Sequence, residues 1–151
     1  MRRIDTIIIH CSATRADIPL SPSELDKMHR RRGFDGCGYH YYVRRDGTVH
    51  DMRPVARIGA HCRGHNAASV GICYEGGLDA RGTPADTRTP AQHAAMQALV
   101  YALRRKYPAI RRVCGHRDLS PDRNGDGVIS PAERLKQCPC FEAEKEFGPP
   151  G

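Results

Sequence analysis

Three side chains that could share a metal ion stand at separate points of the sequence. His10 closes an apolar, β-branched run, His116 follows a second such run, and Cys138 precedes a proline. Two imidazoles and a thiolate are a suitable ligand set for a catalytic zinc ion, because three protein ligands leave a fourth position open for water. The three residues are far apart in the chain, so their spacing by itself indicates such a site only weakly.

The elements that would have to bring these residues together can be predicted from hydrophobic patterns. We expect β-strands over residues 5–11, 39–44, 48–51, 70–74 and 111–114, with Asp46-Gly47 as a hairpin turn. Capping boxes at 21–24 and 89–92 begin two helices, which Gly33 and Pro108 end. The order of strands and helices predicts an α/β fold in which a mixed central sheet of about five strands is flanked by helices.

Short motifs run in a fixed order over nearly the whole chain. They are IIIHCSAT at 7–14, GYHY at 38–41, RDGT at 45–48, GAH at 59–61, Asn66 with SVGI at 69–72, GG at 76–77, GHR at 115–117 and KQCP at 136–139. As a set they resemble the phage-type (type 2) zinc N-acetylmuramoyl-L-alanine amidases, which share a fold with the peptidoglycan-recognition proteins. The resemblance implies that fold and hydrolysis of the amide bond between sugar and peptide in peptidoglycan.

The resemblance also implies a role for five residues. The zinc ligands fall on His10, His116 and Cys138, and the catalytic residues on Tyr39 and Lys136. Zinc would supply hydroxide near neutral pH and polarise the scissile carbonyl. Lys136 would stabilise the developing oxyanion, and Tyr39 would orient the water or assist proton transfer.

Two further positions match the family near the metal, and one departs from its pattern. His61 is expected to contact the substrate or the transition state, although a loop histidine is the alternative. Asn66 is expected to bind substrate or to brace its loop. Cys140 follows Cys138-Pro139 where many relatives lack a thiol, and it could pack, form a disulfide or compete for zinc. No role is assigned to the remaining histidines, His29, His40, His50, His65 and His93.

A second cation site is predicted between His116 and Cys138. Residues 122–133 satisfy the EF-hand loop pattern, with calcium ligands expected from Asp122, Asn124, Asp126, the Val128 carbonyl and Glu133. A capping box at 130–133 would begin an exit helix, whereas no entering helix is visible. The alternative is a surface turn rich in Asx and Gly, with Glu133 only capping. We therefore expect zinc as cofactor, with calcium as a second cation that braces the loop.

The bulk composition limits the remaining possibilities. A chain of 151 residues, 39% hydrophobic and 27% charged, is expected to form a single domain, 1–151, with the EF-hand-like loop inserted. The net charge of +7 suits an anionic partner, but the chain lacks a basic nucleic-acid motif, so we expect peptidoglycan and no nucleic acid. A monomer is expected. Five of the seven cysteines are expected to be buried and reduced: Cys11, Cys37, Cys62, Cys73 and Cys114.

The sequence suggests no membrane span and no secretory signal. The chain is therefore expected to be cytoplasmic as synthesised and to act on the cell wall after release or delivery. A phage lysis enzyme, a delivered toxin and a recycling enzyme all fit this expectation. The main alternative function is a non-catalytic peptidoglycan-binding module of the same fold, and the complete set of ligand and catalytic residues favours the enzyme.

Overall fold

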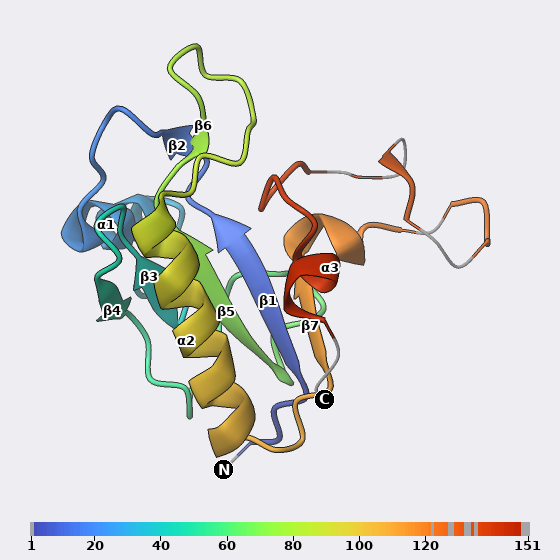
Figure 1. Cartoon of the computed structure of the whole chain (residues 1–151). Helices are drawn as coiled ribbons and strands as arrows, with labels where there is room; N and C mark the ends of the chain where they lie inside the picture. Colours follow the sequence, from blue (N-terminus) through green and yellow to red (C-terminus); the bar gives the residue numbers. More distant parts are fainter. Residues whose placement is uncertain (1, 122, 127–128, 132–133, 135, 149–151) are drawn as a thin grey trace.

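The structure is a computed structural model that describes residues 2–121, 123–126, 129–131, 134 and 136–148. Its central feature is a five-stranded sheet in the order β4-β3-β5-β1-β7 (Figure 1). The strands are β1 (Thr6–Cys11), β3 (Tyr41–Val43), β4 (Val49–Asp51), β5 (Ser69–Tyr74) and β7 (Arg112–Gly115). Only the edge strand β4 is antiparallel to its neighbour, and the other three pairings are parallel. The mixed sheet predicted from the sequence is confirmed.

Two long helices flank this sheet, α1 (Pro22–Arg31) and α2 (Pro90–Lys106). The helix α2 lies across one face, where Ile9 of β1 and Ile72 of β5 pack in one buried cluster with Met96 and Val100 (Figure 1). The helix α1 packs on the opposite face, because Leu25 shares a cluster with Tyr42 and Cys73. Strand side chains alternate between faces, so His10 lies on the face that α2 does not cover.

Several smaller elements have no counterpart among the sequence predictions. They are the parallel pair β2 (Thr14–Arg15) and β6 (Gly77–Leu78), the 3₁₀ helix η1 (His116–Leu119) and the helix α3 (Ala143–Phe147) beside β7. Two-residue strands and a five-residue helix are too short to show a hydrophobic period. Of the described residues after Ser130, where an exit helix was expected, Pro131 lies in a 3₁₀ turn, whereas Arg134 and Lys136 lie in irregular structure.

The first turn of α2 is held over the ends of β3 and β5. Thr89 and Gln92 form the expected capping box. The fully buried Gln92 amide also donates to the carbonyl of Val43 at 3.2 Å and to that of Glu75 at 3.0 Å. The polar side chain therefore satisfies backbone groups at two strand ends and fixes the position of the helix.

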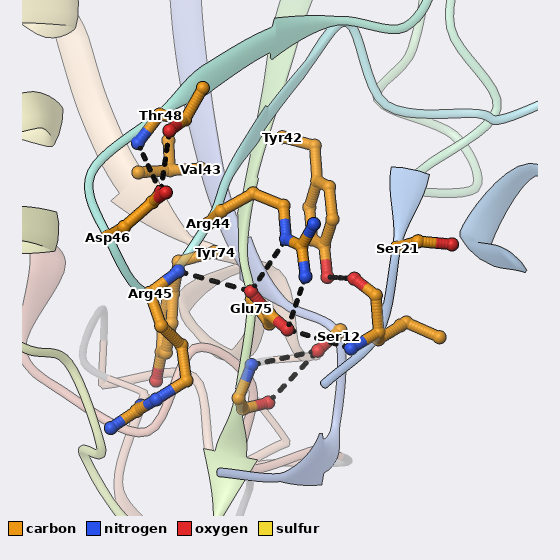
Figure 2. Close-up of polar contacts among 12 residues, drawn as sticks. Ser12, Ser21, Tyr42, Val43, Arg44, Arg45, Asp46, Thr48, Tyr74 and Glu75 are labelled. Atoms are coloured by element: carbon orange, nitrogen blue, oxygen red, sulfur yellow. Dashed lines mark hydrogen bonds and ion pairs between the residues drawn. The ribbon is translucent and has the colours of Figure 1, made fainter. Parts of the chain in front are cut away.

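A buried carboxylate joins the loops at the same end of the sheet. Glu75, which follows β5 and is 2% exposed, accepts hydrogen bonds from the backbone N–H of Leu20 at 2.7 Å and of Arg45 at 3.1 Å. Its other partner is the Arg44 guanidinium at 2.9 Å (Figure 2). Burial raises the pKa of Glu75, but these hydrogen bonds outweigh it and hold the pKa below the ordinary value. One side chain thus ties the segment before α1 and the β3–β4 hairpin to β5.

The five cysteines expected in the interior are buried, and all seven cysteines are free thiols. Among the described residues, no helix is long and apolar enough to cross a membrane.

Candidate metal centre

The fold brings together the three residues that the sequence analysis selected as metal ligands. His10 lies near the end of β1, His116 begins η1 directly after β7, and Cys138 lies in the loop before α3. One ligand atom from each lies within 4.8 Å of the other two. Because β1 and β7 are adjacent and parallel, their carboxyl ends meet at one edge of the sheet, and both imidazoles are delivered there.

Four contacts hold the Cys138 segment against the sheet. The backbone N–H of Cys11 donates to Cys138 Sγ at 3.1 Å, and the N–H of Arg117 donates to the Cys138 carbonyl at 2.8 Å. The Tyr74 hydroxyl donates to the carbonyl of Pro139 at 2.6 Å. Gly115 completes the fit, because a Cβ there would lie 2.5 Å from Pro139 Cδ. The thiol is therefore positioned by three strands rather than by its own loop.

Burial keeps the imidazoles of this site neutral. Burial lowers the pKa of His10 well below its usual value, and the nearby His61 and His116 lower it further. Burial and then Lys136 lower the pKa of His116 to about 4. A neutral imidazole is the form that binds a metal.

The donor set fits zinc in both chemistry and size. Zinc takes nitrogen and sulfur ligands at about 2.0–2.3 Å, so a small contraction of the three side chains would bring them onto one ion. Cys140 lies apart from this set, with its thiol 3.4 Å from the Gly77 carbonyl. A hydrogen bond with Cys11 and burial raise the pKa of Cys140, which keeps it a thiol. Cys138 is thus the better placed of the two sulfur ligands.

A cleft of about 720 Å³ opens beside the three residues. Tyr39 and Lys136 both line it together with His116 and Cys138. Tyr39 is half-buried in the loop before β3, with its ring centroid 5.0 Å from that of His10. Burial raises the pKa of Tyr39 well above the ordinary value, so the phenol keeps its proton. Lys136 is exposed at the rim.

His61 and Asn66 also line the cleft, and contacts within the protein engage the Asn66 side-chain oxygen and both ring nitrogens of His61. The Asn66 side-chain oxygen accepts from the backbone N–H of His61 at 3.0 Å and of Cys62 at 2.9 Å. His61 Nδ1 lies 2.8 Å from His10 Nε2. Burial lowers the pKa of His61 to about 3. The geometry gives Asn66 a loop-bracing contact and places His61 behind the candidate ligand His10.

Sequence reasoning missed three residues of the cleft wall, His29, Arg32 and Arg63. His29 is buried on α1 one turn after Leu25, and its Nδ1 accepts from the Gly38 N–H at 2.8 Å. The spacing of Leu25 and His29 was the available signal, whereas nothing in the pattern distinguishes the two arginines. None of the described residues that line the cleft is acidic.

The predicted calcium loop lies largely outside the described residues, because Asp122, Val128 and Glu133 are not among them. Asn124 and Asp126 are described and contact each other: the Asp126 N–H donates to Asn124 Oδ1 at 3.1 Å. The Asn124 amide also lies 3.3 Å from Asp126 Oδ2. Such contacts occur in any Asx turn, so calcium binding stays a prediction.

Comparison with known proteins gives a consistent result. A family described as N-acetylmuramoyl-L-alanine amidase matches residues 1–139. The endolysin of Enterobacteria phage K11 is 35% identical over 91% of this chain and 81% of its own length. The endolysin of Escherichia phage T7 is 32% identical over 93% and 83%.

Solved structures agree with the sequence comparison. The N-acetylmuramoyl-L-alanine amidase LysC from Clostridium intestinale superposes with a TM-score of 0.73 at 28% identity, over 96% of this chain and 82% of that one. The bumblebee peptidoglycan-recognition protein PGRP-SA shares the fold, with a TM-score of 0.71 at 22% identity over 97% and 81%. This chain therefore belongs to the N-acetylmuramoyl-L-alanine amidase family.

Proposed function

We propose that this amidase uses a zinc ion held by His10, His116 and Cys138 to hydrolyse peptidoglycan. The bond cleaved joins the lactyl carboxyl group of N-acetylmuramic acid to the amino group of L-alanine. The observation that carries the proposal is the convergence of two neutral imidazoles and one thiol from distant segments, two of which, His116 and Cys138, line a cleft.

The residues around the ligands have distinct tasks. When bound, zinc makes water acidic enough to act as a nucleophile near pH 7 and polarises a carbonyl. Lys136, exposed at the rim, presents a positive charge to the oxygen of the scissile carbonyl as negative charge develops there. Tyr39 keeps its phenolic proton and can donate a hydrogen bond within the cleft.

The products follow from the bond that is cleaved. Water adds to the carbonyl carbon, the C–N bond breaks, and a proton reaches the departing nitrogen. The muramic acid carboxylate and a peptide with a free N-terminal alanine are released. A wall that holds Arg32 and Arg63 and no acidic residue among its described members suits a peptide that carries several carboxylates.

The proposal also covers the partner of the protein, its oligomeric state and the place where it acts. The proposed partner is peptidoglycan and not nucleic acid. The cleft is lined by residues of a single chain, so a monomer is sufficient for activity. The enzyme would act on the cell wall after release or delivery from the cytoplasm.

Digestion of purified peptidoglycan tests the proposal. We expect new N-terminal alanine to appear with the zinc-loaded enzyme, to disappear with a chelator and to return with added zinc. Binding to peptidoglycan without any release of peptide would instead support the non-catalytic module. Release of reducing sugar ends without free alanine would point to a different bond and contradict the proposal.

A further inference from the structure

Behind the proposed ligand His10 lies a chain of buried polar groups that no step of the hydrolysis uses. His10 Nε2 lies 2.8 Å from His61 Nδ1, and His61 Nε2 lies 3.3 Å from the Ser69 hydroxyl oxygen. The same hydroxyl lies 2.7 Å from the carbonyl oxygen of His65. His10, His61 and Ser69 are 1%, 9% and 1% exposed, so water does not compete for these contacts.

The direction of every hydrogen bond in this chain of groups follows from the group at its end, the His65 carbonyl oxygen. A carbonyl oxygen can only accept, so the Ser69 hydroxyl must donate its single proton to His65. The Ser69 oxygen is then an acceptor for His61 Nε2–H. A neutral His61 protonated on Nε2 has a bare Nδ1, which accepts from His10 Nε2–H. His10 is left with its lone pair on Nδ1.

We infer that Ser69 and His61 are positioning residues that fix the tautomer and ring orientation of His10, so that Nδ1 is the nitrogen offered to the metal. This inference rests on the proposed zinc site, because it specifies which atom of His10 binds there. Groups that hydrogen-bond to a metal-binding histidine commonly set its tautomer, and losing them weakens metal binding by about 10- to 100-fold.

The surrounding backbone is built to hold the His61 ring in this place. A Cβ on Gly71 of β5 would lie 2.6 Å from His61 Cγ, and one on Gly59 would lie 2.6 Å from His61 Cδ2. Both glycines therefore leave the space that the ring occupies. We call the chain of contacts from His10 through His61 and Ser69 to the His65 carbonyl the relay. Asn66 braces the loop that carries two of its members, His61 and the His65 carbonyl.

The relay gives His61 a positioning role in place of the substrate contact that was expected from the sequence. Its two ring nitrogens are both occupied within the protein, one by His10 and one by Ser69. Removing His61 should therefore weaken zinc binding and lower kcat while the KM for peptidoglycan fragments stays near that of the wild type. A substrate-binding residue would give the opposite pattern.

Two measurements test the inference. Nitrogen-15 NMR of labelled histidines should find His61 protonated on Nε2 with or without zinc, and His10 protonated on Nε2 with Nδ1 bound when zinc is added. Competition with a chelator should give a zinc Kd about tenfold or more weaker for Ser69→Ala and His61→Leu. His61→Asn, whose amide oxygen can accept in place of Nδ1, should recover part of the loss.

Thr6→Val is the matched control, because Thr6 pairs with Ser69 on the neighbouring strand and its hydroxyl contacts only Asp5 among the described polar contacts. It should bind zinc as the wild type does. A proton on His61 Nδ1, zinc on His10 Nε2, or an unchanged Kd in folded Ser69→Ala and His61→Leu would overturn the relay. A wild-type protein that binds no zinc would refute the proposed function instead, and the tautomer of His61 would still decide the relay.

Discussion

At the scale of single residues, burial decides the charge of the groups around the metal centre. The pKa values of His10, His61 and His116 all lie below the ordinary value, mainly through burial. These imidazoles are neutral at pH 7, so they need lose no proton before they bind a cation. Tyr39 is likewise held in its protonated form. The two imidazoles of the site are therefore neutral donors, whereas the cleft beside them carries the positive side chains Arg32, Arg63 and Lys136.

Tyr39→Phe should slow the hydrolysis without weakening metal binding. The phenolic proton is lost while the ring that packs 5.0 Å from His10 is kept. We expect kcat to fall about 100-fold, the lower end of what a positioned proton donor contributes, with zinc content and melting temperature unchanged. Steady-state kinetics with metal analysis checks this result, and a variant with wild-type kcat would remove Tyr39 from the mechanism.

The sequence proposed ligand and catalytic residues only because motifs in family order supported them. Spacing alone could not join His10 to Cys138, which lie 128 positions apart in the chain. The parallel pairing of β1 with β7 brings His116 beside His10, and the backbone N–H of Cys11 holds the Cys138 thiol there. Ser69 and His29 were missed for a related reason. Their contacts depend on loops whose path the pattern does not reveal.

At the scale of elements, Glu75 shows how loops at one end of the sheet are kept in place. The carboxylate is shared by the segment before α1, the β3–β4 hairpin and the end of β5. The pKa of Glu75 is lower in the folded protein than in the unfolded chain, where a glutamate has a pKa of about 4.3. The carboxylate therefore contributes its full stabilisation at pH values above the unfolded-state pKa, and this stabilisation is lost as the pH falls through the folded-state pKa.

Glu75→Gln should therefore destabilise the protein in a pH-dependent way. Removing the charge leaves the Arg44 guanidinium without its partner, and we expect a loss of about 3 kcal/mol in the free energy of unfolding at pH 7. The difference from the wild type should shrink as the pH falls below about 4. Urea unfolding at several pH values measures it, with Asp51→Asn on the exposed edge strand as the control. A constant difference at all pH values would contradict the assignment.

Gly71→Ala tests whether the sheet makes room for the His61 ring. The added methyl group would lie 2.6 Å from His61 Cγ, and overpacking of this kind costs about 1–3 kcal/mol. In a His61→Ala background the space is free, so the same substitution should then cost little. Equal losses in both backgrounds, measured by denaturant unfolding, would show that Gly71 has another role.

The main elements were predictable because their patterns are strong. The buried run of β1 and the capping boxes of α1 and α2 mark those elements within one or two residues. The predicted strand over 39–44 begins too early, since Tyr39 lies in a loop that turns it toward the cleft. The pair β2–β6 was not predictable, because each strand has only two residues and the two strands lie far apart in the sequence.

At the scale of the whole molecule, the predicted calcium loop belongs to the segment that joins two of the proposed zinc ligands, His116 and Cys138. Its ligand pattern is complete in sequence, while the exit helix expected with it is not found at Arg134 or Lys136. If calcium braces the segment between two zinc ligands, adding it to metal-stripped protein should raise the melting temperature. Asp126→Ala should abolish the rise, and no shift in either protein would show that the loop is an ordinary turn.

The central claim is that one zinc ion, bound through Cys138 and not through Cys140, cleaves the bond to L-alanine. The most direct measurement compares zinc content and release of N-terminal alanine for the wild type, Cys138→Ser and Cys140→Ser on the same peptidoglycan. We predict one zinc ion and full release for the wild type, near-normal values for Cys140→Ser, and loss of both zinc and release for Cys138→Ser. A Cys138→Ser protein that retains full activity would contradict this account.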